Sequence, residues 1–241
     1  MMGIIFDDVG KTSTKKLVMR VLEATTQNLM VFVYISRIFD LHRDKPPASE
    51  LSKVDQTIDL TLKNPRLDLE SKKRHELIEI VKEIYRSKSF IAIRSEILEN
   101  FISQNGPYSI KTGVYNCYIE PTIKHGKRII GNNNRKIDSV FHNNDTLPME
   151  FVECKSNIAS VIPADMTLNR MQTEKREKVE YLIDAYNYLS TAFCEPAIYI
   201  ACYNNNYERQ LTNVQQNWGY HFINFISPNE LYQIISEKPA V

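Results

Sequence analysis

Two strand-like segments joined by a polar turn constrain the fold of this 241-residue chain more than any other feature. Residues 135–141 (RKIDSVF) and 149–156 (MEFVECKS) are each rich in β-branched and aromatic side chains. The intervening residues 142–148 (HNNDTLP) contain the Asn, Asp and Pro side chains that favour chain reversal. The sequence therefore predicts a β-hairpin over 135–156.

Three charged residues interrupt this hairpin: Asp138 in the first strand, and Glu153 and Lys155 in the second. Side chains alternate between the faces of a strand, so Glu153 and Lys155 lie on the same face. A register that pairs Asp138 with Glu153 would bring all three within roughly 5–8 Å, whereas a shift by one residue would move Asp138 to the other face. The sequence alone leaves the register open.

Two carboxylates beside a lysine suit one kind of chemistry. Mg²⁺, or Mn²⁺ in its place, binds through one or two protein carboxylates and takes its remaining ligands from water and phosphate. A neighbouring lysine can orient or deprotonate an attacking water, or stabilise the charge that develops on a phosphate. The set is therefore suited to metal-assisted hydrolysis of phosphodiester bonds.

Asp138, followed after a connection of fourteen residues by Glu153-Cys154-Lys155, resembles the catalytic core of the PD-(D/E)XK, or restriction-endonuclease-like, nuclease superfamily. The resemblance implies that Asp138 and Glu153 are catalytic metal ligands and that Lys155 is the catalytic lysine. Ile137 stands where the family name has Pro, which many members lack. The other interpretation is an exposed Glu153–Lys155 ion pair on an edge strand. Apolar residues at both parities of the strand favour a position inside a sheet.

Composition excludes several classes of protein. The net charge is +1, so any binding of nucleic acid must come from a local basic patch. The four cysteines form no Cys-x-x-Cys motif and predict buried thiols in the reducing cytoplasm. The apolar run at 29–35 is far shorter than the roughly 20 residues that span a bilayer, so we expect a cytoplasmic protein without a membrane partner.

Residues 1–88 are predicted to form an all-helical module after a ragged start at 1–12. A helix is expected from Lys15, capped by Thr12, Ser13 or Thr14, to about Asp40. Its run at 29–35 fits a buried helix or a buried strand. A short helix from Ser49 and an amphipathic one over 69–85 follow. The module could form a homodimer, dock a partner subunit, cover the substrate channel, or simply extend the core.

Residues 89–241 are predicted to form the nuclease-like domain, an α/β fold. The expected order αβββαβ, extended by αβα, with a mixed central sheet flanked by helices, is what the resemblance implies. The predicted helices cover 89–105, 163–192, 208–217 and 228–235. The predicted strands cover 110–120, 127–141, 149–156, 197–203 and 219–226.

Further site candidates come from the same resemblance. The helix before the sheet often supplies an additional acidic ligand, which points to Glu99 and less strongly to Glu96, although Glu99 falls opposite the apolar stripe of its helix. The helix after the E-x-K strand often carries groups near the DNA, which points to Gln172 and Lys175. Arg135 and Lys136 could contact phosphates or face solvent. The cluster Lys72-Lys-Arg74 could follow a phosphate backbone or form a solvated helix face.

The sequence thus predicts a Mg²⁺- or Mn²⁺-dependent nuclease acting on DNA, and by analogy a role in restriction or anti-phage defence. Cutting both strands would need two sites and hence a homodimer. The alternatives are a catalytically inactive nucleic-acid-binding or assembly subunit with the same fold, an RNA-directed nuclease, and an interaction protein built around the helical module.

Overall fold

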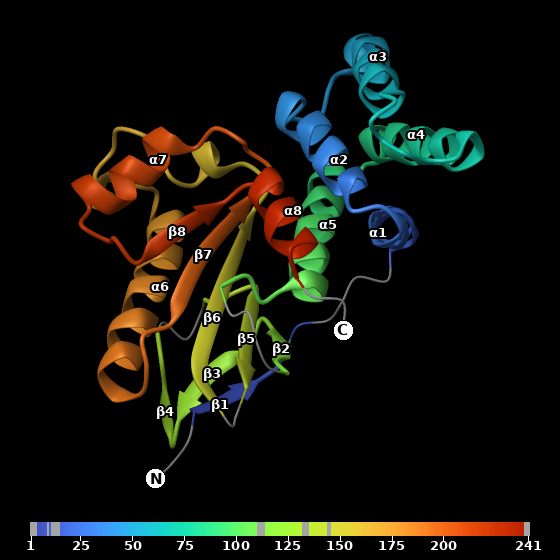
Figure 1. Cartoon of the computed structure of the whole chain (residues 1–241). Helices are drawn as coiled ribbons and strands as arrows, with labels where there is room; N and C mark the ends of the chain where they lie inside the picture. Colours follow the sequence, from blue (N-terminus) through green and yellow to red (C-terminus); the bar gives the residue numbers. More distant parts are fainter. Residues whose placement is uncertain are drawn as a thin grey trace.

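The computed structural model describes residues 4–8, 10, 15–109, 114–131, 135–143 and 146–238, and the core of this part is a five-stranded mixed sheet (Figure 1). In spatial order its strands are β2 (Asn116–Ile119), β5 (Ser139–Asn143), β6 (Thr146–Lys155), β7 (Ala197–Cys202) and β8 (Ile223–Ile226). The pairs β2–β5 and β5–β6 are antiparallel, and the pairs β6–β7 and β7–β8 are parallel. The predicted α/β class with a mixed sheet is confirmed.

Helices cover both faces of this sheet (Figure 1). On one face lie α5 (Phe90–Asn105) and α8 (Pro228–Ser236); on the other lie α6 (Thr173–Ala192) and α7 (Glu208–Thr212), which runs into a π-helical turn (Asn213–Asn217). Neighbouring β6 residues belong to different cores, because Val152 packs with α5 and Phe151 packs with α6. The central strand is therefore apolar at both parities, as the sequence predicted.

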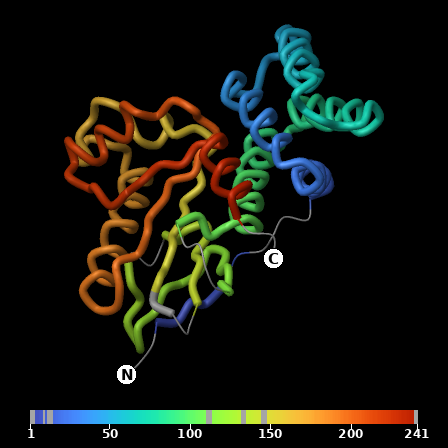
Figure 2. Tube along the Cα trace, viewed as in Figure 1, coloured from blue at the N-terminus to red at the C-terminus, as the bar shows by residue number. Residues whose placement is uncertain are grey.

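A second, three-stranded sheet contains β1 (Ile4–Asp7), β3 (Thr122–His125) and β4 (Arg128–Ile129) in the order β1-β3-β4. The prediction that the N-terminal module is all-helical after a ragged start is therefore wrong at residues 4–7. Figure 2 shows this first strand beside the middle of the chain. A four-residue strand is too short to show periodicity, so only its pairing with β3 reveals it.

The single strand predicted over 127–141 is also wrong, because this stretch contributes β4 to one sheet and β5 to the other. Strand β3 was not predicted. Gly126, with φ of 60°, lies in the turn between β3 and β4, where a left-handed conformation favours glycine. The first residues of the strand predicted over 110–120 lie outside the described residues, and its remainder forms β2.

Four helices form the N-terminal part: α1 (Lys16–Gln27), α2 (Met30–Leu41), α3 (Leu51–Leu62), preceded by a 3₁₀ turn (Ala48–Glu50), and α4 (Ser71–Arg86). The helical interpretation of 29–35 is confirmed, but the single helix from 15 to 40 is wrong. Asn28 interrupts it, because its side chain accepts a hydrogen bond from Met30 N at 2.9 Å and donates one to Asp68 O at 2.9 Å. The predicted capping residues 12–14 lie outside the described residues.

The long helix predicted from Pro163 begins only at Thr173. Before it, Ile158–Ser160 and Leu168–Arg170 form 3₁₀ turns. Side chains from the α7 region hold this stretch in its irregular path: Asn213 donates to Pro163 O and Met166 O at 2.8 and 2.9 Å, and Trp218 donates to Met166 O at 2.9 Å. These bonds take carbonyls that a continuous helix would use internally.

The apolar core of the N-terminal helices continues through α5 into the sheet. Buried side chains of α1, α2 and α4 belong to the same cluster as Phe141, Val152 and Ala201 of the sheet. The division at residue 88 into two domains stays a prediction, and the packing is continuous across it. No helix of the described ranges is both long enough and apolar enough to cross a membrane.

Candidate active site

The hairpin register places the two predicted carboxylates side by side. Strand β5 pairs with β6 through Ser139↔Val152 and Val140↔Phe151, so the next step along the ladder sets Asp138 opposite Glu153. Asp138 Oδ2 accepts a hydrogen bond from Cys154 N at 2.6 Å. Of the two registers that the sequence left open, the one that brings the carboxylates together is therefore confirmed.

Two lysines approach this carboxylate pair from different elements. Lys155, on β6, is ion-paired with Glu153 Oε1 and donates to Cys154 O at 3.0 Å. Lys178, on α6, lies with its Nζ 3.0 Å from Glu153 Oε2 and 3.9 Å from Asp138 Oδ1. The side chain of Glu153 is only 2% exposed, so both ammonium groups act across a largely dry site.

Sequence reasoning did not select Lys178. It follows Lys175 by one helical turn and precedes the buried Leu182 by four residues, so it extends the buried stripe of α6. A lysine on an apolar stripe is the signal that could have identified it. Its ammonium also donates to the Lys136 carbonyl, which ties α6 to the segment before β5.

The protonation of the site follows from this geometry. Burial and the neighbouring charge of Glu153 raise the pKa of Asp138 to about 7, although Lys155 and Lys178 oppose this rise. Burial would also raise the pKa of Glu153, but Lys155 and Lys178 hold it below its usual value. The two carboxylates raise the pKa of Lys155 despite its burial. At neutral pH, Glu153 is therefore ionised and Lys155 is cationic, while Asp138 is present in both its protonated and its ionised form.

A cavity of about 410 Å³ opens beside these groups. Cations outnumber carboxylates along its wall, which consists of Glu120, Arg135, Lys136, Lys155, Val161, Glu174, Lys175 and Lys178. Three of the four residues predicted to contact nucleic acid, Arg135, Lys136 and Lys175, thus share one cavity with Lys155. Arg135 is also paired with Glu177 on α6 at 2.8 Å. The cavity suits an anion with several oxygens, such as a phosphate group.

Gln172, the fourth predicted nucleic-acid contact, is the exposed residue immediately before α6. It lines a smaller hollow of about 180 Å³ that shares Val161 and Lys175 with the main cavity. The structure therefore places Gln172 next to the carboxylate site but outside it.

Glu99 lies on α5, and burial raises the pKa of its side chain while Lys155 lowers it. The structure does not combine it with Asp138 and Glu153 into a ligand set: the described part of the chain contains no group of three or more His, Cys, Asp or Glu side chains arranged to hold a metal. Its predicted role as a third ligand stays a prediction. Glu96, the weaker candidate, pairs with Lys15 of the N-terminal helices.

The cluster Lys72-Lys-Arg74 belongs to a basic run over residues 63–94, and several side chains of this run make contacts within the fold. Lys63 and Lys82 pair with Asp59, and Arg86 pairs with Asp55. In addition, Arg74 donates to the carbonyls of Leu67 and Leu69. These contacts favour the interpretation of the run as a helix surface that holds α3 and α4 in place.

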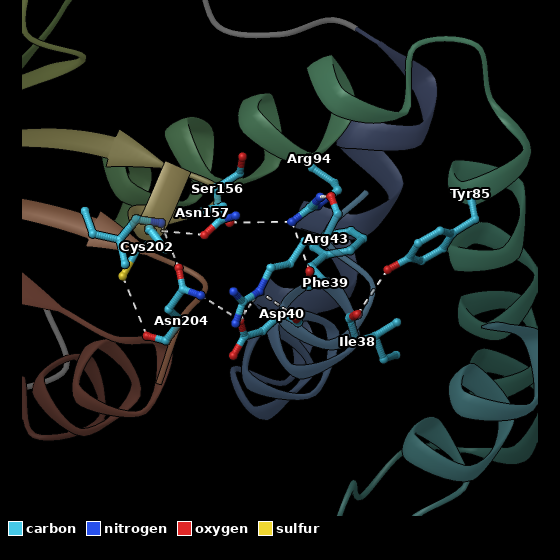
Figure 3. Close-up of polar contacts among 12 residues, drawn as sticks. Ile38, Phe39, Asp40, Arg43, Tyr85, Arg94, Ser156, Asn157, Cys202 and Asn204 are labelled. Carbon is cyan, nitrogen blue, oxygen red and sulfur yellow. Dashed lines mark hydrogen bonds and ion pairs between the residues drawn. The ribbon is translucent and has the colours of Figure 1, made fainter. Parts of the chain in front are cut away.

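A buried polar network lies behind the C-terminal end of β6 (Figure 3). Arg94 of α5, which is 2% exposed, donates to Phe39 O at 2.9 Å, to Ser156 O at 3.5 Å and to Arg43 O. Aromatic rings of Phe90, Phe39 and Tyr203 surround its guanidinium at 5.1, 5.3 and 5.8 Å. The segment just after Lys155 is thereby fastened to the end of α2.

A second connection runs parallel to the first. Asn204, which follows β7, accepts from Ile158 N at 2.8 Å and donates to Asp40 Oδ1 at 2.7 Å (Figure 3). The N-terminal helices therefore help to hold the backbone that leaves the carboxylate site.

No protein-family model, curated protein or solved structure matches the chain. The chemistry of the site must accordingly be argued from its own residues. Two converging carboxylates are flanked by the ammonium groups of Lys155 and Lys178, and both of these lysines also line a cationic cavity. Such an arrangement can bind a cation and an anionic substrate next to each other.

Proposed function

We propose that the chain is a metal-dependent nuclease of the PD-(D/E)XK type that hydrolyses phosphodiester bonds in DNA. The observation that carries the proposal is the position of the Lys178 ammonium between Glu153 Oε2 and Asp138 Oδ1. A cation already fits between these two oxygens. Glu153 Oε2 is buried and, within the described ranges, has no hydrogen-bond partner in addition to that ion pair. Two such oxygens are the protein contribution that Mg²⁺ requires.

The topology supports the same proposal. From α5 to β7, the elements of the main sheet follow the order α5, β2, β5, β6, α6, β7, in which the first three strands are antiparallel and the fourth is parallel to the third. This arrangement agrees with the αβββαβ core that the resemblance implied. In it, Glu153 and Lys155 lie at the end of the central strand, where α6 and the cavity meet.

Asp138 and Glu153 would hold the metal, and a bound Mg²⁺ or Mn²⁺ supplies a Lewis acid that polarises the scissile phosphate and lowers the pKa of water. Lys155 faces the same cavity, and its raised pKa keeps it cationic. It therefore serves to orient the attacking water and to stabilise charge on the phosphate, and is poorly suited to act as a general base. Lys136 and Lys175 provide further charges for the flanking phosphates.

One observation favours a second candidate function, nucleic-acid binding without hydrolysis. The charges of Asp138 and Glu153 are balanced by Lys155 and Lys178 without any metal. A site of this kind could retain the cationic cavity and bind nucleic acid while the ion pairs only stabilise the fold.

The decisive experiment is cleavage of plasmid DNA and of single-stranded RNA in Mg²⁺ or Mn²⁺, with a chelator control. We expect the wild type to cut DNA, and Glu153→Ala and Lys155→Ala to lose at least about 100-fold in rate. Glu174→Ala is the matched control, because Glu174 lines the same cavity but, among the described residues, forms no ion pair with Lys155 or Lys178. Its rate should stay within a few-fold of wild type.

Equal cutting by all variants would refute the assigned residues, and preferential cutting of RNA would replace DNA as the substrate. If the wild type binds DNA but none of the proteins cuts, the second candidate function is correct. Linear rather than nicked plasmid as the first product would support a homodimer with two sites.

A further inference from the structure

We propose that Lys178 is a displaceable counter-ion for the metal site: its ammonium neutralises Asp138 and Glu153 while the site lacks a metal, and moves into the cavity toward the substrate phosphate when the metal binds. This inference rests on the proposed function and adds a regulatory property to it. Lys178 would make metal binding weak in the free protein and stronger in the presence of nucleic acid.

The position of Lys178 is the first argument. Its Nζ lies 3.0 Å from Glu153 Oε2 and 3.9 Å from Asp138 Oδ1, so it takes the place between the two carboxylates that a metal would need. Its side chain is 18% exposed and lines the cavity, which gives it a direction in which to move. An ammonium on a flexible four-carbon stem can make this movement without displacing α6.

Charge balance is the second argument. Asp138 and Glu153 carry two negative charges when ionised, and Lys155 and Lys178 carry two positive ones. A divalent cation would add two more positive charges within a few ångströms, where repulsion in a dry site is strong. One ammonium must therefore leave for the metal to bind well.

Lys178 is the better candidate to leave. Lys155 keeps a second partner on its own strand, the Cys154 carbonyl at 3.0 Å, and is paired with Glu153 Oε1, whereas only Lys178 lies within 4 Å of both Glu153 Oε2 and Asp138 Oδ1 among the ion pairs of the described residues. Lys178 has its additional bond to the Lys136 carbonyl, at the wall of the cavity that would receive the phosphate. A phosphate there would provide the anionic partner that Lys178 loses when the metal displaces it.

The coupling is reciprocal by thermodynamic linkage. If the phosphate stabilises the displaced position of Lys178, it raises the affinity for the metal, and the metal raises the affinity for the phosphate by the same factor. The free protein would then carry little metal at low concentrations of the ion and would assemble its site on the substrate.

The test is calorimetric titration of the full chain with Mn²⁺, in the absence of nucleic acid. We expect Lys178→Met to bind Mn²⁺ about tenfold more tightly than wild type, because a repelling charge is removed. Lys175→Met is the matched control: it removes the same charge from the same cavity, but no ion pair joins Lys175 to Asp138 or Glu153 within the described residues. Its affinity should change by less than about threefold. Lys178→Gln serves as a second variant if the methionine variant does not fold.

The outcomes separate this inference from the function on which it rests. Tighter binding by Lys178→Met and Lys178→Gln, abolished again by adding Glu153→Gln, supports the counter-ion role. Unchanged or weaker Mn²⁺ binding by both Lys178 variants overturns the counter-ion role. If the wild type nevertheless binds Mn²⁺ and loses this binding with Glu153→Gln, the metal site itself remains supported. Absence of Mn²⁺ binding in the wild type and in both Lys178 variants would overturn the metal site itself.

Discussion

At the scale of single residues, the fold changes the protonation of Asp138. Its side chain is 14% exposed and shares the site with Glu153, so the folded protein disfavours the ionised form of Asp138. Asp138 is predicted to become a ligand, for which it must lose its proton. The affinity of the site for a metal is therefore expected to rise with pH toward neutrality.

The same shift predicts how stability depends on pH in metal-free buffer. The pKa of Asp138 rises from 3.8 to about 7 on folding, so the folded state holds a proton that the unfolded state releases. This contribution to the free energy of unfolding is complete below pH 3.8 and is lost as the pH rises to about 7. Urea unfolding at several pH values in this range gives the free energies of unfolding of wild type and Asp138→Asn. As the pH rises, the wild type should lose stability relative to the variant. A difference that stays constant with pH would contradict the raised pKa.

The residues also show what sequence can and cannot predict. Asp138, Glu153 and Lys155 were identifiable because charges on an apolar strand are conspicuous. Lys178 belongs to a different element, and its approach to Glu153 depends on how α6 packs across the sheet. Local sequence does not encode that packing. The apolar stripe of α6 indicates only which face of the helix is buried.

At the scale of elements, the site depends on how α2 meets the sheet. Arg94 donates to two carbonyls near the C-terminal end of α2, where a cation is favoured by the helix dipole, and to Ser156 O after β6. The prediction of elements failed at comparable junctions. Asn28 divides one predicted helix, and Asn213 and Trp218 prevent another from beginning at Pro163. Periodicity finds the middle of an element, whereas long-range hydrogen bonds fix its ends.

Replacing Arg94 is expected to loosen this junction. Arg94→Met keeps an unbranched side chain but leaves buried carbonyls without a donor, which should lower the free energy of unfolding by roughly 3 kcal/mol. Arg43→Met is the control, because the Arg43 side chain is exposed and pairs with Asp40, three residues before it at the end of α2; this substitution should cost less than about 1 kcal/mol. Urea unfolding measures both values. Equal effects of the two substitutions would show that Arg94 does not hold α2 against the sheet.

At the scale of the whole molecule, a nearly neutral protein concentrates cations in one cavity. The net charge is +1, yet Arg135, Lys136, Lys155, Lys175 and Lys178 line the same hollow. Binding of nucleic acid should therefore involve few phosphates and lose affinity with salt only moderately. Helix α4 and helix α6, which carries Lys175 and Lys178, lie on opposite sides of α5 (Figure 1).

This distribution predicts which substitutions change the salt dependence. Lys136→Ala and Lys175→Ala should each reduce the slope of log affinity against log salt by about 0.9, the value for one lost phosphate contact on duplex DNA. Lys72→Ala, on α4, should leave the slope unchanged. Fluorescence anisotropy with a short DNA duplex at several salt concentrations measures these slopes. If only Lys72→Ala reduced the slope of log affinity against log salt, nucleic acid would bind at α4 and not at the cavity.

The pairing of β1 with β3 has a consequence for how the molecule is made. Strand β1 leaves the ribosome before its partner, residues 122–125, which lies far along the chain from it. The helices α1 to α5 emerge in between and can form from local contacts, whereas the β1–β3 ladder has a high contact order and must form late. Strand β1 is thus synthesised before these helices but takes its place in the small sheet only after them.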